Sequence, residues 1–135
     1  MDKMTKKPQK DNRRSGASIP GEWLYFSPKE VTVRQIAALL PNDLYELEIW
    51  EEAGVLEVEI GDACSVDIEH TQIHPRDEIT HAFARENHCK EVFLVTFVPE
   101  HYEKAKEVML QILKGNGGLF CGDTEDFSPI LKKED

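Results

Sequence analysis

The sequence predicts an α+β domain, built on a mixed, mainly antiparallel sheet of four to six strands with about three helices packed on one face. Three observations predict this class. Apolar and acidic residues alternate with period two across 45–69, apolar residues recur at helical spacing in three other segments, and residues 92–98 form a nearly continuous apolar run. With 135 residues the chain is long enough for one domain and too short for two ordinary ones. We therefore expect residues 19–135 to form a single domain.

Apolar residues at intervals of three and four predict three helices, at 33–40, 76–87 and 100–114. A Thr–Gln pair suited to a capping box begins the first helix, and Pro41 ends it. In the second helix, Ile79, Ala82 and Phe83 are expected to form the buried stripe. The third helix has the strongest pattern and ends at the glycine-rich segment 115–118, which can cap a helix and reverse the chain.

Period-two alternation predicts three consecutive antiparallel strands with one buried face and one wet face, at 45–50, 55–60 and 64–69. Residues 51–54 and 61–62 supply the turns between them. The apolar run 92–98 predicts a strand that is buried on both sides near the centre of the sheet. Two shorter apolar segments complete the sheet: 23–26 is expected as an edge strand or an anchoring segment, and 119–121 as a short final strand.

Charge is distributed unevenly along the chain. The formal net charge is −10, yet residues 1–18 contain six Lys or Arg residues against two Asp residues. This segment has too little apolar surface to offset the entropy of ordering, so we expect a disordered basic tail. Such a tail could contact an anionic partner, remain solvated, or lie against the acidic body of its own chain.

The acidic residues concentrate in the predicted three-strand unit. Between residues 43 and 69 there are ten Asp or Glu residues and no Lys or Arg. Because side chains alternate between the two faces of a strand, six of these carboxylates should emerge from one face together with the indole of Trp50. These candidate partner-binding residues are Glu46, Glu48, Trp50, Glu57, Glu59, Asp67 and Glu69. The competing interpretation is a solvated face that only keeps the protein soluble.

The charge pattern favours an interaction role. Like charges that face each other across strands oppose folding, so a patch of one sign is expected mainly where function requires it. A negative patch attracts a basic protein partner and disfavours nucleic-acid binding by the folded domain, because phosphates need clustered bases. We therefore expect a non-enzymatic protein-binding module. Its size, acidity and α+β plan are similar to those of small bacterial immunity and inhibitor proteins, although no motif carries the likeness.

A reducing, cytoplasmic location is expected, because the chain has three cysteines and its Lys-rich first residues are followed by no apolar signal segment. No apolar run approaches the length of a membrane span. The sequence contains no nucleotide fingerprint, paired-Cys spacing or Ser-His-Asp order, and we assign it no cofactor, no metal ligand and no catalytic residue.

Two alternatives stay open. The first is a small enzyme or metal-dependent domain that uses the loop after Gly117, with a histidine from elsewhere in the chain. The residues considered for it are Cys121, Asp123, Asp126, His70 and His74. Nearby acidic residues disfavour the formation of a reactive thiolate at Cys121. The second is a self-associating structural protein that uses Val55, Trp50 or the segment 23–26 as its interface.

Overall fold

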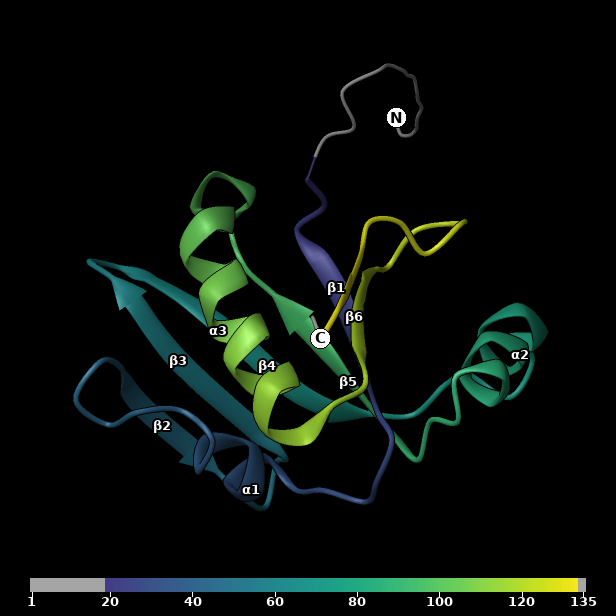
Figure 1. The fold of residues 1–135 in the computed structure, drawn as a ribbon, viewed down its shortest axis with the longest axis horizontal. Helices are drawn as coiled ribbons and strands as arrows, with labels where there is room; N and C mark the ends of the chain where they lie inside the picture. The colour runs from purple at the N-terminus through teal and green to yellow at the C-terminus, as the bar shows by residue number, and fades with distance from the viewer. Residues whose placement is uncertain (1–18, 134–135) are drawn as a thin grey trace.

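The computed structural model describes residues 19–133, which form one seven-stranded sheet with helices on both of its faces (Figure 1). In chain order the elements are β1 (Glu22–Ser27), α1 (Val33–Ala37), β2 (Glu46–Trp50), β3 (Val55–Gly61), β4 (Cys64–Thr71), α2 (Glu78–Glu86), β5 (Glu91–Thr96), the 3-10 turn η1 (Pro99–His101), α3 (Tyr102–Asn116), β6 (Leu119–Gly122) and β7 (Ile130–Lys132). Their order across the sheet is β2-β3-β4-β5-β1-β6-β7. The expected basic tail, 1–18, lies outside the described residues.

The α+β class is confirmed, but the expected count of four to six strands was too low. The additional strand is β7, whose three residues pair with β6. A segment this short displays too little alternation to be recognised as a strand from the sequence. The sheet is also not mixed, because every strand pairing in the described part of the chain is antiparallel.

The segment 23–26 is a central strand, and the expectation of an edge strand or anchoring segment was wrong. β1 lies between β5 and β6, and its side chains after Glu22 are buried on both faces of the sheet. Trp23 and Tyr25 pack beneath the helices α1 and α3, while Leu24 and Phe26 belong to a second cluster on the opposite face. A strand that is apolar on both sides has to be covered on both sides, which places it in the interior of the sheet.

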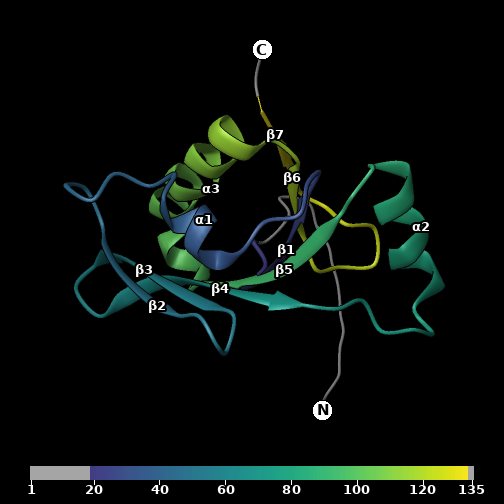
Figure 2. The same cartoon turned by 90° about the horizontal axis from the view of Figure 1, so that it is seen from below.

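The helices cover both faces of the sheet, so the expectation that they pack on one face was also wrong. α1 and α3 lie over the larger core, whereas α2 lies apart from them beside the other end of the sheet (Figure 2). Phe83 of α2 meets Phe26 edge-on, with ring centroids 5.4 Å apart, and stacks on Phe127 at 4.1 Å. These rings bury the apolar residues that β1, β5 and β6 direct to the second face.

α2 packs through only part of the stripe that the sequence predicts. Ala84 is buried and Phe83 contacts the second cluster, but Ile79 is 69% exposed. The C-terminal half of the helix makes the contacts with the sheet, and its first turn extends past them. The longest helix, α3, has 15 residues, and no helix within residues 19–133 is long and apolar enough to cross a membrane.

The start of α1 and the first hairpin follow the local signals, whereas α1 ends at Ala37, before the end that Pro41 predicts. Thr32 accepts a hydrogen bond from the backbone N–H of Gln35, and the Gln35 side chain accepts one from the N–H of Thr32, which completes the capping box. Gly54 has φ +68° in the turn between β2 and β3, and a Cβ there would lie 3.1 Å from the Cβ of His70. The turn between β2 and β3 therefore lies at a position that favours glycine.

A buried polar network links β1 to the end of α3. The Asn116 amide donates to the Tyr25 hydroxyl at 2.8 Å and to the Ser27 hydroxyl at 2.9 Å. Each hydroxyl in turn donates to a backbone carbonyl, Tyr25 to Gly117 at 2.5 Å and Ser27 to Lys29 at 2.6 Å. Burial raises the pKa of Tyr25 to about 12, and the hydrogen bonds with Asn116 and Ser27 offset part of that effect. Every donor of the network named here is used, so removing one member takes a hydrogen bond from at least one other group of the network.

We expect Asn116→Ala to lower the free energy of unfolding by about 1–3 kcal/mol, because the Tyr25 and Ser27 hydroxyls lose their shared donor in a buried site. Chemical denaturation with an unchanged m-value would measure this. Lys114→Ala, at an exposed position of the same helix, is the matched control and should change stability little. Equal effects of the two substitutions would contradict the structural role of the network.

Candidate functional site

The pairing of β2, β3 and β4 places the six candidate carboxylates on one side of the sheet. Glu46 lies opposite Glu59 and Glu48 opposite Glu57, while Asp67 pairs with Glu57 from the other side. We call this surface the acidic face, and it consists of Glu46, Glu48, Trp50, Glu57, Glu59, Asp67 and Glu69. It lies on the opposite side of the sheet from α1 and α3.

Burial of the alternate residues holds the carboxylates in this position. Leu56, Val58 and Val66 are wholly buried and Ile68 nearly so, and all four pack in the larger core under α1 and α3. A slip of one residue in the register would turn these side chains to solvent and bring carboxylates into the core. The same hydrophobic pattern that builds the core therefore fixes the acidic face.

The side chains of the acidic face form rows across the strands. The central row runs from Glu48 through Glu57 and Asp67 to Thr96 on β5 and Glu22 on β1. Paired residues in neighbouring strands have Cβ atoms about 4.5–5.5 Å apart, so three adjacent members of this row are carboxylates within reach of one another. The register thus extends the row to Glu22, which the sequence pattern alone does not connect with the face.

Glu57 stands in the middle of the central row, with a carboxylate opposite it on each side. Partial desolvation raises the pKa of Glu57, and the neighbouring carboxylates of Asp67, Glu48 and Glu59 raise it further, while a hydrogen bond with Ser65 lowers it in part. Each of these neighbours disfavours the charged form of the carboxyl group. The carboxylates around Glu57 therefore repel one another, and a positive charge placed beside them would reduce this repulsion.

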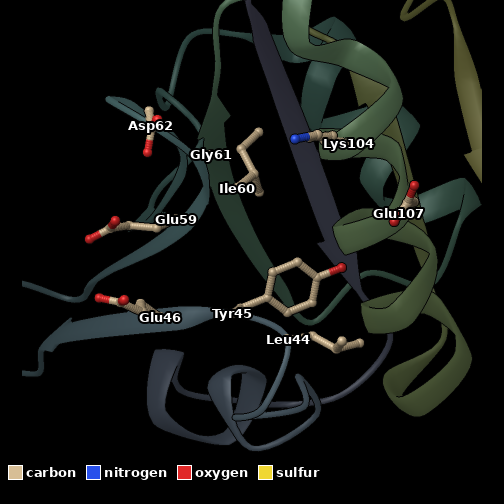
Figure 3. A pocket seen from close by; sticks show the side chains of 9 residues that line it. All are labelled: Leu44, Tyr45, Glu46, Glu59, Ile60, Gly61, Asp62, Lys104 and Glu107. Carbon is tan, nitrogen blue, oxygen red and sulfur yellow. The ribbon is translucent and has the colours of Figure 1, made fainter.

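None of the salt bridges within residues 19–133 involves the acidic face. Arg34 pairs with Glu51 in the turn after β2, and His70 contacts Glu91 at 2.6 Å between Nε2 and Oε1. Lys104 of α3 lies on the helix side of the sheet and points toward Ile60, whereas Glu46 and Glu59 point away from it (Figure 3). In this part of the chain the carboxylates are thus left without an ion-pair partner.

A shallow groove of about 280 Å³ crosses the acidic face. Four polar residues, Glu57, Asp67, Glu69 and Thr96, line it together with three apolar residues, Trp50, Val55 and Leu94. The indole of Trp50 is 47% exposed. Leu94 and Thr96 were missed by the sequence analysis, because their contribution depends on β5 pairing with β4, which local alternation does not predict. Thr96, the single polar residue in the run 92–98, was the available signal.

The alternative site around Cys121 is not assembled. Cys121 is wholly buried, and burial, with a smaller contribution from Asp123, raises the pKa of its thiol to about 12. His70 pairs with Phe93, and Cys121 is aligned with Leu24 on the other side of the sheet. The histidine and the thiol therefore lie on opposite faces with two strands between them, too far apart for nucleophile activation.

Among the described residues, neither the histidines nor the acidic loop after β6 provides the ligand arrangement of a metal site. The His74 ring accepts a hydrogen bond from the backbone N–H of Arg76, and Asp126 accepts hydrogen bonds from the hydroxyls of Thr124 and Ser128. Across residues 19–133 no three side chains of His, Cys, Asp or Glu are placed to ligate one metal ion. Local hydrogen bonds account for the arrangement of this loop.

We expect Glu57→Gln to raise Tm at pH 7 by about 1–4 °C, because it removes a carboxylate that faces two others across the strands. The pKa of Glu57 is raised in the folded state, so this carboxyl binds a proton more readily in the folded chain than in the unfolded one. The destabilisation it causes should therefore fade as the pH falls through the raised pKa, and the difference between variant and wild type should fade with it.

Thermal unfolding at several pH values measures this difference. Glu22→Gln is the matched control, because Glu22 stands in the same row but pairs with Thr96 instead of a carboxylate. A gain in Tm for Glu57→Gln that stays constant down to pH 4, or that Glu22→Gln reproduces, would show that repulsion across the strands is not its cause.

No known protein family, no curated protein and no solved structure matched the chain.

Proposed function

We propose that the chain is a non-enzymatic cytoplasmic protein-binding module that presents its acidic face to a basic surface of another protein. The observation that carries the proposal is the alignment of six carboxylates on one sheet face with no ion-pair partner among the described residues. Wet sheet faces in stable domains normally mix charges of both signs. A face of one sign opposes folding locally, and such opposition is expected mainly at functional sites.

The electrostatics suit rapid recognition of a cationic partner. A cleft or patch lined by one sign of charge raises the local concentration of opposite charges and can accelerate association by about 10- to 1000-fold at low salt. Relief of the repulsion around Glu57 adds a favourable contribution when a Lys or Arg side chain arrives. Binding should consequently weaken as salt screens these charges.

The groove provides what charge alone lacks, an apolar anchor. Trp50 stands half-exposed at the margin of the groove, and Leu94 and Val55 line it. Tryptophan is enriched among the residues that dominate binding energy, and carboxylates around it can exclude water and orient the partner. An Arg side chain could lie over the indole while it pairs with a carboxylate.

The chemistry indicates a partner that carries clustered Lys and Arg residues, such as a basic toxin or a nucleic-acid-binding enzyme that this chain blocks. A row of carboxylates can occupy a basic groove that otherwise takes phosphates. Self-association is less suited to the site, because two copies of the acidic face repel each other. The segment 23–26, the other interface considered for self-association, is buried in the centre of the sheet.

Charge reversal on the acidic face tests the proposal. We expect Glu48→Lys/Glu57→Lys to slow association with a fluorescent lysine oligomer at least about tenfold at about 0.1 M salt, measured by stopped flow. The control is Glu100→Lys/Glu103→Lys, which makes the same change in net charge at exposed positions of η1 and α3. Circular dichroism and thermal unfolding establish that both variants remain folded.

The control variant should slow association less than about threefold, because distant charges are screened over roughly 10 Å at 0.1 M salt. Equal slowing by the two variants would mean that net charge alone attracts the oligomer, and the acidic face would lose its assigned role. Association that does not change between low and high salt would equally contradict the proposal.

A further inference from the structure

β2 forms an open margin of the sheet. Only β3 pairs with it, and no strand in the described part of the chain pairs with its other side. In Figure 2, which views the molecule from below, β2 lies along the margin of the sheet and α1 lies above it. An edge strand presents unpaired backbone N–H and C=O groups that can pair with another extended segment.

The two faces of β2 differ in the partner that they would accept. Glu46 and Glu48 point to the acidic face, and Leu47 and Ile49 point to the helix side. Leu47 and Ile49 are only half-buried, whereas their inner neighbours, Val58 and Leu56 of β3, are wholly buried. Apolar surface on the helix side of this edge is thus incompletely covered.

The surface beside the start of β2 is open in the same way. Leu44 is 68% exposed, and a pocket of about 470 Å³ lies between this segment and α3. Tyr45, Ile60 and the stem of Lys104 line the pocket (Figure 3). An additional strand at this edge would cover apolar surface that the chain itself leaves exposed.

The charges disfavour a second copy of this chain as the occupant. If two β2 strands paired antiparallel, Glu46 and Glu48 of one copy would face the same acidic residues of the other. Like charges directly opposite each other destabilise a strand pair, and charged side chains are a usual means of preventing edge-to-edge association. The same two carboxylates favour a strand whose outward residues are Lys or Arg.

We propose that β2 takes up, by strand addition, an extended segment of a basic partner protein in which Lys or Arg residues alternate with apolar residues. The basic residues would stand opposite Glu46 and Glu48, and the apolar residues opposite Leu47 and Ile49 on the helix side. This inference rests on the proposed function for the charge of the partner and adds the conformation and pattern of the segment that binds. Five residues of β2 match a segment about 17 Å long.

Synthetic peptides of the same composition distinguish the effect of an alternating residue pattern from the effect of net charge. An alternating Lys-Val peptide should bind the full chain about tenfold more tightly than a peptide of the same composition with its lysines and valines in two blocks. The alternating peptide with N-methyl groups on the amides that face β2 should lose this advantage, because it can no longer donate to the edge. Hydrogen exchange should slow at Glu46–Trp50 when the alternating peptide binds.

Two double charge-reversal variants, which change the net charge by the same amount, locate the contact. Glu46→Lys/Glu48→Lys changes the residues opposite the added strand, and it should abolish the preference for the alternating peptide. Glu57→Lys/Asp67→Lys makes the same change on β3 and β4, away from the edge, and should weaken both peptides by similar factors. Thermal unfolding of each variant shows whether it remains folded.

Equal affinity for the alternating and the blocked peptide, or slowed exchange away from β2, would overturn strand addition. If binding of both peptides were still lost on reversal of the acidic face, the proposed function would stand without this inference. Failure of the wild-type chain to bind either peptide at low salt would overturn both. Slowed exchange at β2 that grows with protein concentration in the absence of peptide would assign the edge to a second copy and refute the proposal.

Discussion

The register of β2, β3 and β4 is the constraint on which the acidic face depends. Leu56, Val58 and Val66 are wholly buried under α1 and α3, and the residues that alternate with them along each strand have to point the other way. A shift by one position would exchange the two sets and place carboxylates in an apolar core, at a cost of several kcal/mol for each charge that is not neutralised. The core and the acidic face are therefore two outcomes of one alternating pattern.

One part of the second face of the sheet is buried, and the other part is exposed to solvent. Over β1, β5 and β6 the outward residues are apolar apart from Glu22 and Thr96, and α2 with Phe127 covers the apolar ones. Over β2, β3 and β4 the outward residues are mostly acidic and no helix covers them. The boundary falls at Leu94, which contacts the buried cluster on one side and lines the groove with Trp50 on the other. This boundary gives the acidic face an apolar margin, as a binding surface requires.

The sequence predicted the features that local pattern determines. The period-two alternation alone predicted that the carboxylates of β2, β3 and β4 share one face, because short turns leave little freedom in how consecutive strands pair. The prediction failed where pairing is distant in sequence: β1 joins β5 and β6 across about 70 and 95 residues, so its central position has no local signal. For the same reason Leu94 and Thr96 were missed at the groove. Ile79 was misplaced because helical periodicity does not show where a helix extends beyond the sheet that it covers.

Chemical-shift mapping tests most directly whether the acidic face is the cation-binding surface of the molecule. A lysine oligomer added to the ¹⁵N-labelled chain at low salt should perturb the amides of β2, β3 and β4 and the indole N–H of Trp50, with the buried indole of Trp23 as an internal reference. The perturbations should reverse when salt is added. Shifts centred on the acidic residues of α2, α3 or the loop before β7, with the Trp50 indole unchanged, would contradict the account.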